Sequence, residues 1–384
     1  MKSLVLYSKF STSDIIDLKD KPKQIDKNEV ELHINLWKIK NGIVRIKPNL
    51  VFDFGIKFDS TISELCLFLP FRIPKKHGYK DLGKCLSSNR NLLNAVFNED
   101  MICQSANNHC FSKVSVNDIE SGTDSKDKDF YIYHLGEDNI SVVNYIEDSE
   151  IKGTYLTINI HGNPSNNDNV KNVEKYYVRF RIYVKDIKEI VQTEILSNDL
   201  LQAAFSRMDL FDIRLNERRE IPSKVEEKMK KDNFKLCSFK KLHFFYIVDT
   251  HESIKNGIDI RKDSRLLEND QWIEYEPQSN IEGINYIAHH WKKKEDKVFS
   301  HFSLFFTSIY PKLSLVRLLA YFSIIVLLGW CGSMLSFPGN DLFPLDIHSN
   351  WISFSIVLII FLFVVVYILK SNIVILWIKF RRKL

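Results

Sequence analysis

The chain has 384 residues, of which 45% are hydrophobic and 26% are charged, and its formal net charge is +5. This length and composition exclude a disordered chain and are sufficient for one large or two ordinary domains. Residues 312–384 contain seven of the 53 basic residues and two of the 48 acidic ones, so the remaining residues are balanced. That balance excludes the overall basic surface of a general nucleic-acid-binding protein.

Residues 1–117 are expected to form a first β-rich subdomain. In residues 51–59, apolar side chains alternate with polar ones, which predicts a strand with one core face and one face in water. The Asn41-Gly42 pair lies between two apolar runs and predicts a hairpin turn, because both residues tolerate positive φ. A short helix is expected at residues 89–98, where the apolar residues share one helical face.

A polar stretch at residues 118–129 is expected to be a linker or a long loop, since it lacks large apolar side chains after Ile119. Residues 130–298 are then expected to form a second β-rich α+β subdomain. Within it, residues 240–249 are apolar on both faces, which favours a central, covered strand. Helices are expected at residues 198–209 and 222–233.

The strand pattern at residues 175–187 has two unlike faces. The even-numbered positions from 176 to 184 are apolar and predict a core face, whereas the odd-numbered positions are basic or aromatic. Arginine binds phosphate through two donors and tyrosine rings stack on bases, so the second face is a candidate site for an anionic or nucleotide ligand. The ordinary alternative is a solvated strand face with alternating charges. The candidate ligand-binding residues are Tyr177, Arg179, Arg181, Tyr183 and Lys185.

Asp249 and His251 follow the apolar strand and are two positions apart, so they are candidates for acid–base chemistry or metal binding. The alternative is a strand that ends in a polar turn, for which aspartate is a favoured residue. The chain lacks the common phosphate-binding, dinucleotide-binding and hydrolase motifs, and no spacing of ligands matches a common zinc site. We therefore assign no catalytic residue and expect no cofactor or metal.

Two uncharged apolar runs near the C-terminus predict a transmembrane hairpin in residues 312–384, with spans at about 314–337 and 351–370. The loop between them has no lysine or arginine, whereas the outer flanks and the tail are basic. By the positive-inside rule, both termini are expected in the cytosol and the chain in the inner (cytoplasmic) membrane as a multi-pass protein. Residues 299–311 are expected to lie at the membrane interface. Small residues that would let the helices pack, also between copies of the chain, are Ala320, Gly329 and Ser333.

The expected fold is therefore an α+β, β-rich, sandwich-like cytosolic part followed by a two-helix transmembrane hairpin. This layout favours a membrane-anchored, non-enzymatic sensor-effector, which binds a ligand or partner and acts through the hairpin. Similar layouts occur among bacterial antiviral defence effectors. Two alternatives remain: a membrane-tethered subunit that docks a cytosolic protein, and a membrane-bound hydrolase that uses Asp249 and His251. The expected partners are the lipid bilayer, an anionic or nucleotide ligand, a protein, and further copies of the chain.

Overall fold

The computed structural model describes residues 2–10, 28–39, 49–74, 78–105, 110–117, 129–161, 175–184, 190–194, 205–256, 263–267, 285–312 and 321–329, together with Trp272, Tyr275 and Leu318. The chain forms two compact units. The first consists of Met1–Thr193 and Asp209–Ser308, and the second of Glu194–Met208 and Ile309–Leu384. Every site discussed below lies in the first unit.

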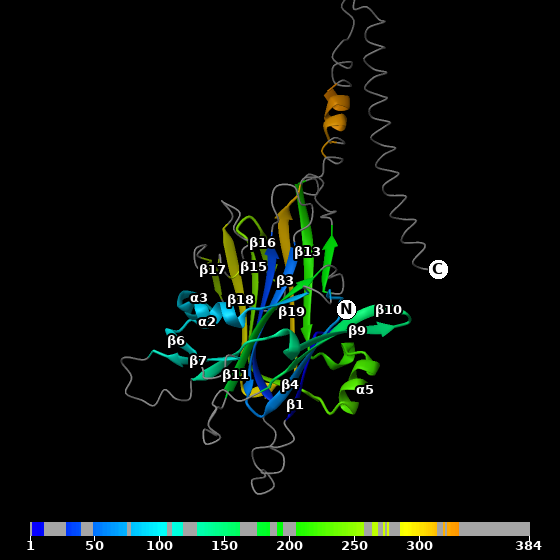
Figure 1. Ribbon diagram of the computed structural model, residues 1–384. Helices are drawn as coiled ribbons and strands as arrows, with labels where there is room; N and C mark the ends of the chain where they lie inside the picture. Colours follow the sequence, from blue (N-terminus) through cyan, green and yellow to red (C-terminus); the bar gives the residue numbers. More distant parts are fainter. Residues whose placement is uncertain are drawn as a thin grey trace, which may run out of the picture. The chain divides into compact units, whose positions relative to one another are not determined.

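A ten-stranded sheet forms the centre of the first unit (Figure 1). Its order is β17-β18-β15-β2-β3-β11-β8-β7-β6, and β5 also pairs with β11. The pairs β2–β15 and β8–β11 are parallel. The bounds of these strands are β2 Glu29–Ile39, β3 Asn49–Asp59, β5 Tyr79–Asp81, β6 Met101–Ser105, β7 Phe111–Val116, β8 Phe130–Tyr133, β11 Lys175–Val184, β15 Ser238–Asp249, β17 Asp263–Leu266 and β18 Tyr286–Phe299.

Two smaller sheets accompany it. One has the order β14-β1-β4-β10-β9, and the other has the order β12-β13-β19-β16. The bounds of their strands are β1 Val5–Phe10, β4 Ile62–Leu69, β9 Ile140–Glu147, β10 Glu150–Asn159, β12 Val191–Glu194, β13 Ser206–Leu215, β14 Lys235–Leu236, β16 Ser253–Asn256 and β19 Phe302–Pro311.

The helices are short. α2 spans Gly83–Ser88, α3 spans Arg90–Phe97 and α5 spans Ser223–Lys231, with single 3-10 turns at η3 Glu137–Asn139 and η4 Arg218–Glu220. α3 begins at Asn89, whose side chain accepts a hydrogen bond from the Leu92 backbone N–H, as expected of an N-cap. The helices expected at residues 89–98 and 222–233 are thereby confirmed. The helix expected at residues 198–209 is wrong for the part of this range that the structure describes, because β13 begins at Ser206.

One face of the ten-stranded sheet packs against the five-stranded sheet, and together they enclose the main apolar core. Phe54 lies at its centre, with ring centroids 5.8 Å from Phe52 and 5.7 Å from Phe180. Burial of one such side chain contributes roughly 1.5–3 kcal/mol. The even-numbered residues of β11 belong to this core, which confirms the predicted core face and the β-rich, sandwich-like part of the fold.

The opposite face of the ten-stranded sheet is covered by α2 and α3, whose Leu86 and Leu92 are fully buried in a second cluster with Trp37 and Tyr177 (Figure 1). Strands from residues 1–117 and from residues 130–298 are interleaved in this one sheet. The stretch at residues 118–129 therefore does not separate two sheets.

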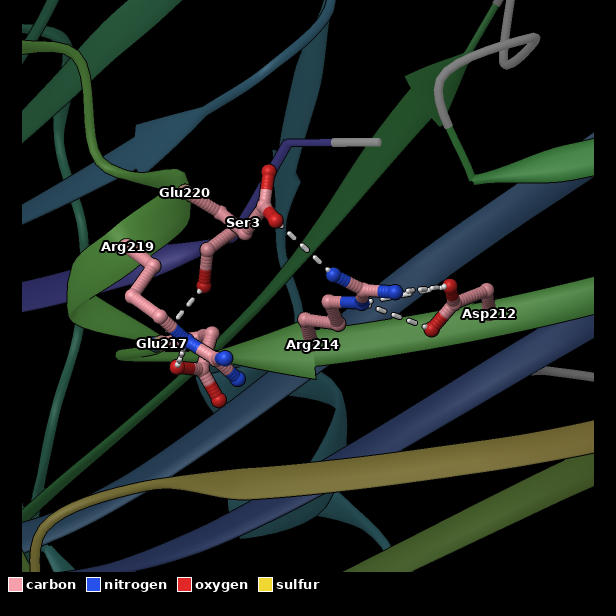
Figure 2. Close-up of polar contacts among 6 residues, drawn as sticks. All are labelled: Ser3, Asp212, Arg214, Glu217, Arg219 and Glu220. Carbon is pink, nitrogen blue, oxygen red and sulfur yellow. Dashed lines mark hydrogen bonds and ion pairs between the residues drawn. The ribbon is translucent and has the colours of Figure 1, made fainter.

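β13 ends in a polar turn that contacts the N-terminal segment, as Figure 2 shows. The Arg214 guanidinium donates to Asp212 at 2.8 Å and to Glu220 at 3.0 Å. The Glu217 backbone N–H donates to the Ser3 hydroxyl at 3.0 Å. Partly exposed ion pairs contribute about 0–1 kcal/mol each, so we interpret this network as a positioning device for the turn.

The C-terminal transmembrane hairpin is the part of the expected fold that the structure contradicts. Within the described residues, no helix is both long and apolar enough to cross a bilayer. Apart from Leu318 and residues 321–329, the first expected span lies outside the described residues, as does the whole second span. The predicted hairpin and the inner-membrane localisation that depended on it are corrected accordingly.

Residues 299–311, expected at a membrane interface, mostly form β19 instead. Its side chains alternate between buried and exposed, and Leu304 and Phe306 are buried in the main core. The aromatic residues that suggested an interface are thus explained by an amphipathic strand.

Candidate functional site

The face of the ten-stranded sheet beneath α2 and α3 carries polar side chains from five neighbouring strands. The strand register places them in rows, because directly paired residues point to the same side of a sheet. We call this surface the polar face. One row contains Lys292, His243, His33, Gly55 and Arg179, and the next contains His290, Phe245, Asn35, Asp53 and Arg181.

A buried ion pair joins Arg181 on β11 to Asp53 on β3. The guanidinium donates to the two carboxylate oxygens at 2.6 and 2.9 Å, and both residues are 0% exposed. Asp53 also accepts hydrogen bonds from the Trp37 indole N–H at 2.7 Å and from the Tyr275 hydroxyl at 2.9 Å. Burial lowers the pKa of Arg181, but the interactions with Asp53, Tyr275 and Tyr183 together raise it by more, so the net shift is upward. The single carboxylate is therefore fully engaged by Arg181 and two neutral donors.

Arg179 lies in the same cluster and is 1% exposed. Its Nε donates to the Tyr275 hydroxyl at 2.7 Å and its Nη1 to the Tyr177 hydroxyl at 2.9 Å. Burial raises the pKa of both tyrosines, so their hydroxyls stay neutral and do not balance the guanidinium charge. Among the described residues, no carboxylate forms an ion pair with Arg179. We call Asp53, Arg179, Arg181, Tyr177 and Tyr275 the Arg179 cluster.

Gly55 gives the Arg179 side chain its space. A Cβ at this position would lie 2.1 Å from the Tyr177 hydroxyl and 3.1 Å from Arg179 Nη1. Any side chain here would therefore displace the tyrosine and disturb the guanidinium. Glycine in the middle of a strand weakens it, which is consistent with a position selected for close approach rather than for strand stability.

A hollow lies over the Arg179 cluster, between the polar face and α3. Its floor includes Arg179, His33 and Asn35, and one wall is formed by Ala95 and Val96 of α3. The cavity volume is about 30 Å³, and the space including the open mouth is about 360 Å³. The enclosed part has room for about two or three water-sized atoms.

Two further side chains define the chemistry of the hollow. Trp272 lines it, is 5% exposed, and its indole N–H has no hydrogen-bond partner in the described part of the chain. Arg265 also lines it and donates to the Ala95 carbonyl oxygen at 3.0 Å. The hollow thus combines a buried guanidinium with an unused N–H donor, which suits an acceptor atom that carries negative charge.

One histidine, His33, lies in the floor of the hollow. Burial, assisted by the proximity of His243 and Arg179, holds the pKa of His33 well below its usual range. His33 is therefore neutral at neutral pH and adds hydrogen-bonding capacity without charge. The positive charge at the floor of the hollow comes from Arg179 itself.

A second buried ionic cluster lies elsewhere in the first unit. Lys38 Nζ donates to Asp209 and to Glu252, each at 3.0 Å, and all three residues are at most 7% exposed. Asp209 also accepts from the Thr193 hydroxyl at 2.7 Å, and Glu252 accepts from the Ser308 hydroxyl at 2.6 Å. We call these residues the Lys38 cluster.

The structure places four of the five predicted ligand-binding residues on the polar face. Tyr177, Arg179 and Arg181 are brought together in the Arg179 cluster, and Tyr183 is half-buried two residues farther along β11. Lys185 lies outside the described residues. The predicted facing of this row is confirmed, but the row is buried beneath α2 and α3 and is not a solvated face.

Asp249 and His251 are adjacent, as their spacing suggested. Asp249 Oδ1 lies 2.6 Å from His251 Nδ1 and accepts the His251 backbone N–H at 2.8 Å, so the pair forms an Asx-type turn at the end of β15. The His251 side chain is 72% exposed. Among the described residues, no group of three or more metal-binding side chains is present. Of the small residues expected to pack the hairpin, Gly329 is described and has open space around it, whereas Ala320 and Ser333 lie outside the described part.

Sequence reasoning missed several residues of the site. Asp53 was expected to face water in an alternating strand, but it is fully buried because Arg181 lies opposite it. One signal in the sequence could have indicated this pair. β3 and β11 are both alternating strands, and the aspartate on β3 has the opposite charge to the arginines on β11, which favours pairing of the two strands. For His33, Asn35 and Trp272 no local pattern marks a shared site, because only the tertiary register brings them together.

Comparison with known proteins does not add to this description: no protein-family model matches the chain, and no curated protein matches its sequence significantly.

Proposed function

We propose that the protein is a ligand-binding module of the sensor type that holds a small anionic molecule in the hollow above Arg179. The observation that carries this proposal is the buried Arg179 guanidinium, which lines the hollow and has only neutral partners among the described residues. Burying an ion that has no ion-pair partner costs several kcal/mol. An anion in the hollow would remove that cost, so the ligand-free protein is prepared to bind one.

The surroundings support a small group at the deep end. Only a few atoms fit beside Arg179, and the unused Trp272 N–H offers a second donor. Phosphate and carboxylate oxygens are the acceptors that guanidinium and N–H donors recognise best. The remainder of a larger ligand would extend through the open mouth of the hollow.

The wall of the hollow provides a route for a response. Ala95 and Val96 belong to α3, which is a short helix, and Arg265 connects it to β17 through the Ala95 carbonyl. If a ligand that contacts this wall binds more tightly when α3 is in one position than when it is in another, binding will shift the population toward the first position. This coupling would make the module a sensor.

Isothermal titration of the full chain with inorganic phosphate, AMP and ATP tests the proposal. We expect binding of at least one probe, and Arg179→Met should weaken it by about tenfold or more. The same substitution should lower the free energy of unfolding of the ligand-free protein by less than about 1 kcal/mol, because it replaces a buried charge that has no ion-pair partner with an apolar side chain. A purely structural arginine would give the opposite result, with unchanged binding and a large loss of stability.

A second variant blocks the hollow without altering any charge. Ala95 is partly exposed, so Ala95→Phe should be tolerated and should fill the space above Arg179. Asn91→Phe, at an exposed position of the same helix that does not line the hollow, is the matched control. The proposal would be contradicted if both variants lost binding or if neither did. It would also be contradicted if no probe bound to the wild-type protein.

A further inference from the structure

The hollow above Arg179 extends across the strands of the large sheet. Its floor is completed by His33 and Asn35 on β2, by Phe245 and Ile247 on β15, and by Ala288 on β18. These three strands are consecutive neighbours in the sheet, and Arg179 lies to one side of them on β11, beyond β3. The floor therefore changes from polar side chains near Arg179 to apolar side chains farther away.

The part of the hollow beyond Asn35 is apolar. Ile247 and Ala288 are direct partners in the pairing of β15 with β18, and both are at most 3% exposed. Val96 and Leu267 also line the hollow, and seven of its eleven described lining residues are apolar. A phosphate or sugar group placed here would lose its hydration without gaining hydrogen bonds, which is unfavourable. A hydrocarbon group would gain free energy by leaving water.

Among the described residues that line the hollow, Arg179 is the one buried cation. Its Nε and Nη1 donate to the two tyrosine hydroxyls, whereas its Nη2 forms no hydrogen bond within the described residues. Arg265, the other arginine of the hollow, is exposed and donates to the Ala95 carbonyl oxygen. The covered part of the hollow thus offers one positive charge with unused N–H groups, followed by an apolar surface.

We propose that the ligand is a hydrophobic carboxylic acid, with its carboxylate at Arg179 and its hydrocarbon part over Phe245, Ile247 and Ala288. This inference rests on the proposed function and specifies the chemical class of the ligand. A carboxylate carries one negative charge, which matches the single buried guanidinium, whereas a phosphate monoester carries about −1.5 to −2. The space of about 360 Å³, including the open mouth, is of the size found for small-molecule sites.

Titration calorimetry of the full wild-type chain with acetate, butanoate and hexanoate tests this inference, because the three acids carry the same charge and differ only in hydrocarbon length. Burial of one methylene group raises affinity by about fourfold. Hexanoate should therefore bind at least about tenfold more tightly than acetate. Hexanol, which lacks the carboxylate, and hexanedioate, which places a second carboxylate in the apolar part, should each bind at least about tenfold more weakly than hexanoate.

A variant tests the apolar floor directly. Ile247→Thr keeps a β-branched side chain but places a hydroxyl group in the floor, so it should weaken the binding of hexanoate by about fivefold or more and leave acetate unaffected. The matched control is Ile182→Thr, the same substitution at a fully buried position of the main core that does not line the hollow. The chain-length series uses the wild type alone and remains decisive if Ile247→Thr does not fold.

The outcomes separate this inference from the proposed function. If inorganic phosphate binds through Arg179 but hexanoate binds no more tightly than acetate, the hydrophobic class is wrong and the anion site stands. Tighter binding of hexanedioate than of hexanoate would also overturn the inference, in favour of a ligand with two acidic groups. Equal weakening of hexanoate by both threonine variants would overturn it as well. If neither the carboxylates nor phosphate, AMP and ATP bind, both proposals fall.

Discussion

The Arg179 cluster and the Lys38 cluster both bury charged groups in the first unit, but their charges are balanced in opposite ways. In the Lys38 cluster, one ammonium lies between two carboxylates, and hydroxyl groups of Thr193 and Ser308 donate to those same carboxylates. In the Arg179 cluster, two guanidinium groups accompany one carboxylate, which forms an ion pair with Arg181, and the hydrogen-bond partners of Arg179 are neutral hydroxyls.

We interpret the Lys38 cluster as structural and the Arg179 cluster as the proposed ligand site. An excess of buried carboxylate can be reduced by taking up a proton, and hydroxyl donors stabilise it in place. The positive charge of an extra buried guanidinium cannot be removed in this way, because arginine does not lose its proton in proteins. The cluster with the permanent excess also lines the hollow. We therefore propose that the Arg179 cluster serves ligand binding and that the Lys38 cluster stabilises the fold.

The largest expected effect comes from Asp53→Asn, which breaks the Arg179 cluster at its only described carboxylate. Both guanidinium groups would then be buried without an opposite charge, and we expect a loss of about 3–5 kcal/mol in the free energy of unfolding. Urea denaturation at neutral pH measures it. A loss below about 1 kcal/mol would show that the cluster is not electrostatically coupled.

Lys38→Met breaks the other cluster and should cost about 3 kcal/mol at neutral pH, because two buried carboxylates lose their counter-charge. Urea denaturation at neutral pH measures this loss. A loss below about 1 kcal/mol would show that the two carboxylates do not depend on the charge of the lysine.

His134 extends the comparison, because a buried imidazole can lose its proton and become neutral, whereas a guanidinium cannot. Burial, with a smaller contribution from Lys84, lowers the pKa of His134 to about 4. The unfolded chain takes up this proton near pH 6.5, so the stabilising contribution is complete above pH 6.5 and is lost as the pH falls toward 4. Between pH 7 and pH 4, the wild type should lose about 3 kcal/mol more than His134→Gln in the same denaturation assay. Parallel curves for the two proteins would refute the assignment.

Gly55→Ala tests the packing of the Arg179 cluster with the smallest expected loss of stability, about 1–3 kcal/mol, because the new methyl group overlaps the Tyr177 hydroxyl. Binding of the anionic probe should fall more than stability does, since the guanidinium is displaced from the floor of the hollow. Gly136→Ala is a suitable control, because its Cβ would meet only the Asn139 side chain, at 3.1 Å. Normal binding by Gly55→Ala would show that the position of Arg179 is not critical.

Much of the β-rich fold could be predicted from local pattern, and the site could be predicted in part. Alternation along β11 correctly separated Phe180 from Arg179, because a period of two is a property of neighbouring residues. The partners could not be predicted: Asp53 and Arg181 are 128 positions apart, and their meeting depends on strand register. The helical hairpin was wrong because its basis was the length and uniform apolarity of two runs, and these measure compatibility with lipid without showing that a spanning helix forms.

The parallel pairing of β2 with β15 has a consequence for how the chain reaches its native state. Val30 pairs with Phe239, roughly 200 residues later, so the centre of the large sheet stays open on one side until β15 has left the ribosome. At about 5–20 residues per second, that interval lasts on the order of 10–40 s. During this time β2 presents an unpaired, largely apolar edge. Biosynthesis of this protein should therefore depend on chaperones that hold nascent strands more strongly than its final stability would suggest.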